Sequence, residues 1–128
     1  MLSTRVKWLR RAADQGIISA KYFLGNAYDT GEGVLEDDKE AIKWFSEAAL
    51  QGHSGAQLNL GVMYARGEGI EEDIVVAYTF WNFAAANGEA QARKNKEIIV
   101  EDMTAAQIEA AQEMSRALLK KFPLLLNR

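Results

Sequence analysis

The 128-residue chain contains no cysteine, a single proline and a single histidine. Without cysteine there is no disulfide framework and no thiolate chemistry. The one histidine, His53, cannot form a metal cluster with others, and no Ser-His-Asp arrangement assembles around it. We therefore expect no catalytic residue, no bound metal and no cofactor, and we interpret His53 as a surface residue without a role.

The sequence also lacks an excess of positive charge and a long apolar run. Its formal net charge is -3 and its pI is about 5.2, whereas a nucleic-acid-binding protein carries a basic stripe. No apolar run approaches the roughly 18 residues that a membrane span needs, and the first residues lack the apolar segment of a signal peptide. We expect neither a nucleic-acid nor a membrane partner. The expected location is cytoplasmic, or periplasmic or secreted if the chain is a piece of a longer precursor.

What the sequence does contain is a repeat of 36 residues. Fourteen residues of the first copy meet identical residues in the second: Ala20, Leu24, Gly25, Tyr28, Gly31, Glu32, Gly33, Glu36, Asp37, Ala41, Ala48, Ala49, Gly52 and Ala56. Self-similarity at a period between about 20 and 50 residues is the signature of a stacked helical array. We expect seven helices and no sheet, near residues 4–15, 18–30, 38–51, 55–66, 74–87, 90–101 and 104–122.

Small and polar residues mark where these helices end, begin and touch. Gly16, with its counterparts one and two repeats later, stands where a left-handed residue stops a helix. The expected N-caps are Ser19, Asp37, Asp73 and Thr104. Glu40 and Gln107 are expected to complete capping boxes with Asp37 and Thr104. Gly25 and Gly61 lie in mid-helix, where glycine costs about 1 kcal/mol against alanine, so we predict that a neighbouring helix approaches closely there.

The predicted fold is all-α: a right-handed α-solenoid of stacked antiparallel helix pairs with a C-terminal capping helix. It divides into a half unit at 5–16, full units at 20–52 and 56–88, a decayed unit at 90–101, and a capping helix at 104–122. The apolar tail Leu124–Leu126 is expected to fold back on the capping helix. The Gly-x-Gly stretches at 31–33 and 67–69 are interpreted as inter-helix turns, because acidic residues flank them and no strand precedes them.

The unit A-x-x-x-L-G-x-x-Y-x-x-G-x-G-V-x-x-D-x-x-x-A-x-x-W-F-x-x-A-A-x-x-G resembles the Sel-one-like repeat (SLR) family, a tetratricopeptide-like α-solenoid. The resemblance covers one complete unit at 20–52, a second at 56–88, a half unit before them and a decayed unit after them. It implies an adaptor or scaffold that binds other proteins without catalysis. Secreted bacterial members often carry paired cysteines, which this chain lacks.

The phase of the repeat and this resemblance together predict a binding surface on the concave face. The residues expected there are Tyr22, Asn26, Asp29, Leu58, Val62, Arg66 and Lys94, with Ile98 beside them. Exposed Leu58 and Val62 would form an apolar strip for an extended or helical peptide, unless adjacent helices cover them. The favoured function is a non-catalytic protein-interaction module. The alternative is a regulatory inhibitor, or an accessory repeat domain of an enzyme such as a hydrolase.

The first helix raises a separate expectation. Residues 5–15 match the second helix of a unit whose first helix is absent, so part of the stripe formed by Val6, Leu9 and Ala13 should face water. The recurrence of Trp8, Trp44 and Trp81 with helical phase predicts core packing, although the absent helix would also have covered Trp8. We expect either a longer array or self-association through this helix.

Overall fold

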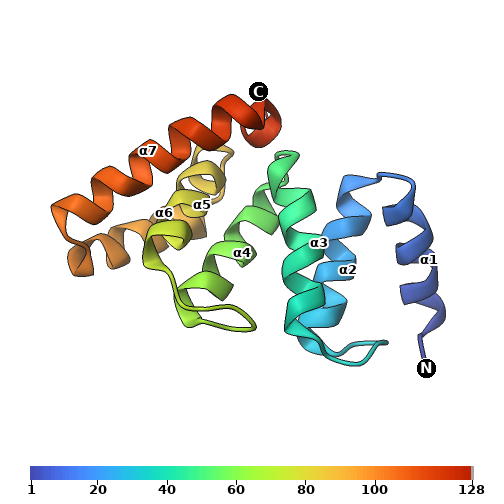
Figure 1. Cartoon of the computed structure of the whole chain (residues 1–128). Coiled ribbons are helices and arrows are strands. Elements are labelled where there is room, and N and C mark those ends of the chain that lie inside the picture. The colour runs from blue at the N-terminus through green and yellow to red at the C-terminus, as the bar shows by residue number, and fades with distance from the viewer. Residues whose placement is uncertain (128) are drawn as a thin grey trace.

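The computed structural model describes residues 1–127, and within them all regular structure is helical (Figure 1). Residues 1–127 contain seven α-helices: α1 (Thr4–Asp14), α2 (Ile18–Thr30), α3 (Asp38–Leu50), α4 (Ser54–Arg66), α5 (Ile74–Ala86), α6 (Ala90–Ile99) and α7 (Ala105–Lys121). Two short 3₁₀ turns, Val100–Asp102 and Pro123–Leu125, precede and follow α7. The predicted number of helices is confirmed.

The helices pack as consecutive neighbours. From α1 to α6, each helix contacts the next one in the sequence, and Figure 1 shows these helices following one another across the molecule. Short amphipathic helices of this kind cannot bury their apolar faces alone, and stacking produces one continuous core. The fold is an α-solenoid, in which α2 and α3 form one unit and α4 and α5 the next.

The predicted helix boundaries follow from local chemistry. Gly16 has a φ of 88°, and the equivalent glycines after α3 and α5 are also left-handed, which side chains other than glycine rarely tolerate. The Asp37 carboxylate accepts hydrogen bonds from the backbone N–H groups of Lys39 and Glu40, and Asp73 caps α5 in the same way. The backbone N–H of Asp37 donates to the carbonyl of Tyr28 at 2.9 Å, which fixes the turn between α2 and α3.

The two mid-helix glycines lie where the predicted close approach occurs. A Cβ added to Gly25 would meet the Phe45 ring at 2.7 Å, and one added to Gly61 would meet Cδ1 of Trp81 at 2.6 Å. Carbon atoms do not approach so closely without displacement. Each glycine therefore makes room for an aromatic ring on the second helix of its unit.

The C-terminal segment differs from the expectation. Helix α7 packs along α5 instead of pairing closely with α6, and the turn after it reaches α3 (Figure 1). Leu125 is fully buried, and its carbonyl accepts hydrogen bonds from Gln57 Nε2 at 2.9 Å and Asn87 Nδ2 at 2.8 Å. The tail therefore does not simply fold back on α7, because the loop edge of the two complete units offers it both an apolar site and amide donors. We call this contact the tail clasp.

Candidate protein-binding surface

The first helices of successive units, α2, α4 and α6, provide the residues predicted for binding. Positions 36 residues apart are equivalent, so Tyr22 corresponds to Leu58 and Lys94, and Asn26 to Val62 and Ile98. The structure does not bring all of these residues together at one hollow. Only Val62, Arg66 and Ile98 border a hollow on this face.

Two adjoining hollows lie between α4 and α6. One, of about 160 Å³, is lined by Val62, Ala65, Arg66, Trp81 and Asn95. The other, of about 190 Å³, is lined by Trp81, Asn95, Ile98, Ile99 and Asp102. Because they share Trp81 and Asn95, they form one surface, which we call the α4–α6 groove. Its lining is mixed: Trp81 and Asn95 belong to both hollows, and Arg66 and Asp102 add one charge of each sign.

The expected apolar strip is only partly available. Leu58 and Val62 are half-buried, because they pack against the cluster around Ala77 and Trp81. The backbone carbonyl of Leu58 also accepts a hydrogen bond from Trp81 Nε1 at 3.1 Å. Of the two alternatives that the sequence left open, cover by adjacent helices therefore holds in part for both side chains. Among the residues that line the groove, Ile98 on α6 is an exposed apolar side chain.

The predicted residues on α2 are occupied within the protein. The Tyr22 ring stacks on the His53 imidazole, with 4.3 Å between ring centroids. The Asn26 side chain accepts a hydrogen bond from Asn59 Nδ2 at 3.1 Å, which links α2 to α4. His53 itself caps α4, since its Nδ1 accepts from the backbone N–H of Ala56 at 3.1 Å. The interpretation of His53 as a residue without a role was therefore wrong.

Neither Asp29 nor Lys94 lines the α4–α6 groove. Burial raises the pKa of the Asp29 carboxyl, and nearby carboxylates, of which Glu68 is the first, raise it further. The Arg66 guanidinium acts on that pKa in the opposite direction. Lys94 is exposed on α6 and lines neither hollow. Whether these two residues bind a partner stays a prediction.

Sequence reasoning missed five groove residues, namely Ala65, Trp81, Asn95, Ile99 and Asp102. Asn95 is equivalent to Asn59 one repeat earlier, and Asp102 to Arg66, so the 36-residue shift contained the signal for both. Trp81 was predicted to be a core residue, which it is, but one edge of its ring also forms the groove floor. Helical phase assigns a side chain to one face and does not reveal that a large ring reaches two surfaces.

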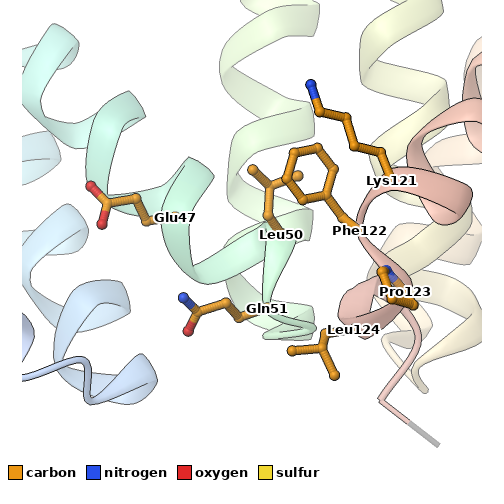
Figure 2. Close-up of a pocket in the computed structure, with 7 residues that line it drawn as sticks. All are labelled: Glu47, Leu50, Gln51, Lys121, Phe122, Pro123 and Leu124. Atoms are coloured by element: carbon orange, nitrogen blue, oxygen red, sulfur yellow. The ribbon is translucent and has the colours of Figure 1, made fainter.

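A second pocket, of about 350 Å³, lies where the tail passes α3 (Figure 2). The C-terminal end of α3 contributes Glu47, Leu50 and Gln51, and the end of α7 with the following turn contributes Lys121, Phe122, Pro123 and Leu124. Its lining is mostly apolar, with Glu47 and Lys121 as the charged members. Glu47 is already paired with Lys21, at 3.2 Å between Nζ and Oε1.

Within residues 1–127, no group of three or more histidine, cysteine or acidic side chains is arranged to hold a metal ion. In the same part of the chain, no helix combines the length and apolar character that a membrane crossing requires.

Comparison with known proteins identifies the family to which the 36-residue repeat belongs. The family profile described as Sel1 repeat matches residues 6–17, 18–53 and 54–89, which is more than half of the chain. The chain belongs to the Sel1 repeat family. Sel1 repeats generally mediate binding between proteins, and proteins of this fold are generally non-catalytic repeat modules. A comparison with curated protein sequences finds no match.

Two solved structures are similar to this chain. The crystal structure of c5321, a protective antigen of uropathogenic Escherichia coli with an SLR fold, is 36% identical, with a TM-score of 0.88. The match covers 96% of this chain and 27% of c5321. A Sel1 repeat protein from Oxalobacter formigenes is 30% identical, with a TM-score of 0.71 over 73% of this chain and 39% of its own. The chain thus spans less than half the length of either protein.

Proposed function

We propose that this Sel1 repeat chain is a non-catalytic interaction module that binds a peptide segment of another protein in the α4–α6 groove. The observation that carries the proposal is the groove itself: two adjoining hollows with a shared indole floor on the face formed by the first helices. An extended segment that laid an apolar side chain beside Ile98 would bury it against Trp81.

Polar groups around the groove favour a segment with charges of both signs. Arg66 is exposed, and its ion pair with Glu68 is long, at 3.5 Å, so the pair contributes little and an incoming carboxylate can replace it. Asp102 is exposed at the other hollow and suits a basic side chain. Asn95 lies between them and provides an amide for the peptide backbone. The preferred ligand is therefore an apolar segment with an acidic residue on one side and a basic residue on the other.

The test begins with a random peptide library displayed on phage and selected against the wild-type protein. Synthetic versions of the enriched peptides are then titrated against the double variant Ile98→Asp with Arg66→Glu. We expect affinity to fall at least about tenfold, because the variant removes the apolar contact and reverses the rim charge. Leu58 is left unchanged, since it supports the packing of α5.

A matched control is Leu35→Asp with Lys39→Glu. It changes an exposed leucine and an exposed lysine near the Gly-x-Gly turn and alters the net charge by the same amount. Binding should survive in this control. Equal loss in both variants, or a library that yields no peptide, would reject the α4–α6 groove as the binding site. The cytoplasmic location expected from the sequence stays a prediction.

A further inference from the structure

Helices α1, α3 and α5 each end at a residue that precedes a left-handed glycine, and this residue differs between them. It is glutamine at Gln15 and Gln51 and asparagine at Asn87. Asn87 is also the one asparagine in the sequence that glycine follows. Asparagine deamidates most readily before glycine, because no side chain hinders attack of the glycine nitrogen on the amide carbon. Glutamine reacts far more slowly, since its ring closure involves one more atom. Helix α5 therefore ends in a reactive pair where α1 and α3 do not.

The side chain of Asn87 is the centre of the tail clasp. Its Nδ2 donates hydrogen bonds to the carbonyl of Leu125 at 2.8 Å and to Gln57 Oε1 at 3.0 Å. Its Oδ1 accepts a hydrogen bond from the backbone N–H of Asn127 at 3.0 Å. An amide can make all three bonds, whereas a carboxylate would keep the acceptor and lose both donors. Residue 87 therefore has to be an amide for the clasp to close fully.

The neighbouring glutamine cannot compensate for the loss of this amide. Gln57 Nε2 already donates to the carbonyls of Ala49 and Leu125. If the Gln57 amide turned to offer Nε2 to a carboxylate at residue 87, these two carbonyls would face an oxygen instead of a donor. A carboxylate at residue 87 would therefore lie at hydrogen-bond distance from two oxygens that repel it.

The closed turn protects Asn87 from the reaction that its sequence favours. Ring closure requires rotation about ψ of Asn87 until the Gly88 nitrogen eclipses Cβ. In the structure ψ is 8°, so this nitrogen eclipses the backbone nitrogen of Asn87 instead. The N–H of Gly88 also donates to the carbonyl of Ala85 at 3.0 Å. The turn and the clasp must therefore open before Asn87 can react.

We propose that Asn87–Gly88 is a deamidation site whose reaction is controlled by the tail clasp. In the opened chain the Gly88 nitrogen bonds to Cγ of Asn87 and passes its proton through water to Nδ2, which leaves as ammonia. Water then adds to one carbonyl carbon of the cyclic imide, and the C–N bond at that carbon breaks. Cleavage at Cγ gives aspartate, and cleavage at the backbone carbonyl gives isoaspartate. One water is consumed and one ammonia is released, without oxidation or reduction.

Either product keeps the clasp from closing again. Aspartate at residue 87 has no donor for Leu125 or Gln57, and isoaspartate in addition lengthens the backbone of the turn by one atom. A reversible opening of the tail is thereby made permanent. The released tail accumulates in chains that have spent more time open, so the site records the history of the clasp.

The first experiment measures deamidation in the full chain and in leucine variants of the tail. Leu125→Asp places a charge at a fully buried position and opens the clasp. Leu124→Asp makes the same change at the adjacent leucine, which is 64% exposed, and is the matched control. Each protein is incubated at mildly alkaline pH and digested with trypsin. Chromatography with mass spectrometry then quantifies aspartate and isoaspartate at residue 87 in the peptide of residues 67–93.

We expect Asn87 to deamidate at least about tenfold faster in Leu125→Asp than in the wild type, because the rate follows the fraction of open chain. Leu124→Asp should react at the wild-type rate. Leu125→Ala, a milder change, should lie between the wild type and Leu125→Asp. Circular dichroism shows whether the helices persist, and if Leu125→Asp loses them, Leu125→Ala decides the result. Wild type unfolded in urea gives the upper limit of the rate.

The second experiment tests the effect of the product on the tail. Asn87→Asp reproduces one product, and Gln15→Glu makes the same amide-to-carboxylate change at the equivalent exposed position after α1. Hydrogen exchange followed by mass spectrometry reports the opening of residues 122–127. We expect exchange in this segment to be at least about tenfold faster in Asn87→Asp and unchanged in Gln15→Glu.

Three results would overturn the proposal. The first is an absence of deamidation at Asn87 even in the unfolded chain, which would remove the site. The second is the same rate in the wild type as in a Leu125 variant that retains its helices, which would remove control by the clasp. The third is a tail that exchanges as slowly in Asn87→Asp as in the wild type, because the product would then be compatible with a closed clasp.

Discussion

The unit of α2 and α3 and the unit of α4 and α5 have the same backbone but connect their buried polar groups differently. At one equivalent position Lys21 forms an ion pair inside its own unit, whereas Gln57 is fully buried and hydrogen-bonds to the tail. At another, the ring over the glycine is Phe45 in the first unit and Trp81 in the second, where it is also held by a hydrogen bond. The residues that recur in both units determine where the helices lie. The residues that differ between the units determine which other segments each unit contacts.

The largest difference between the two units should appear at the buried polar position. Gln57 donates to the carbonyls of Ala49 and Leu125, and its Oε1 accepts from Asn87 Nδ2. Gln57→Ala removes three hydrogen bonds worth roughly 1 kcal/mol each, so the free energy of unfolding should fall by about 3 kcal/mol. Lys21→Ala removes one partly exposed ion pair and should cost about 1 kcal/mol or less. Urea unfolding of both variants measures the difference, and equal losses would contradict it.

The glycines provide the next comparison. Gly61→Ala would force Trp81 away from the Leu58 carbonyl, and overpacking with loss of this hydrogen bond should cost about 3 kcal/mol despite a better helix propensity. Gly25→Ala meets only the Phe45 ring, which has no polar anchor to lose, and should cost about 1 kcal/mol. Thermal or urea unfolding tests the order of the two. A Gly61→Ala variant as stable as the wild type would show that Trp81 is free to move.

A smaller effect should depend on pH, because only α4 has a histidine cap. Burial lowers the pKa of His53, and the carboxylate of Glu89 opposes this in part. The folded state favours neutral His53, so the contribution of His53 to the free energy of unfolding is complete above the pKa of the unfolded chain, near 6.5. It is lost as the pH falls through the folded pKa. Because the residue is partly exposed, the loss should not exceed about 1 kcal/mol, the worth of one N-cap.

Unfolding free energies at pH 7.5 and pH 5 measure this effect in wild type and in His53→Asn. Asparagine is an N-cap that does not titrate in this range, so the variant should lose less stability on acidification. An identical loss in the two proteins would assign the pH dependence to other groups.

The smallest expected effect is at Trp44. Its indole is buried, and within residues 1–127 its Nε1 has no hydrogen-bond partner. Trp44→Phe loses apolar contact but also removes this unpaired donor, and phenylalanine already fills the equivalent position at Phe80. The two effects oppose each other, so stability should change by less than about 1 kcal/mol. A loss above 2 kcal/mol in urea unfolding would mean that the indole nitrogen has a partner, such as water.

The repeat and the glycines made most of this fold predictable. A 36-residue spacing that conserves Gly25, Tyr28 and Asp37 in both copies specifies helix lengths, turns and the close helix contact. The N-cap assignments were less uniform. Asp37, Asp73 and the capping box of Thr104 with Gln107 are confirmed. Ser19 does not cap α2, which begins earlier, at Ile18.

Glu40 was predicted to complete a capping box with Asp37. In a capping box, the Glu40 carboxylate would accept a hydrogen bond from the backbone N–H of Asp37. That N–H donates instead to the Tyr28 carbonyl. Local sequence cannot show such competition, because the competing acceptor belongs to another helix.

The exposure of the proposed binding surface was harder to predict for a related reason. Helical phase places Leu58 and Val62 on one side of α4 but does not reveal that both pack against the cluster that contains Trp81. Trp8 shows the converse: its phase predicts burial, yet the structure contains no helix over it, and it is exposed. Exposure depends on the neighbours of a helix, and the pattern within one helix does not contain that information.

The tail clasp alters how this array should fold and unfold. In a linear array each unit contacts only its neighbours, so the last helices can fray alone. Here Gln57 Nε2 donates a hydrogen bond to the carbonyl of Leu125, 68 residues away. Asn127 Nδ2 donates to the carbonyl of Gly52, 75 residues away. Such distant contacts close a large loop, which slows folding and couples distant segments. Amide hydrogens of α7 should therefore exchange together with those of α4, in one cooperative opening, and not as a separate frayed end.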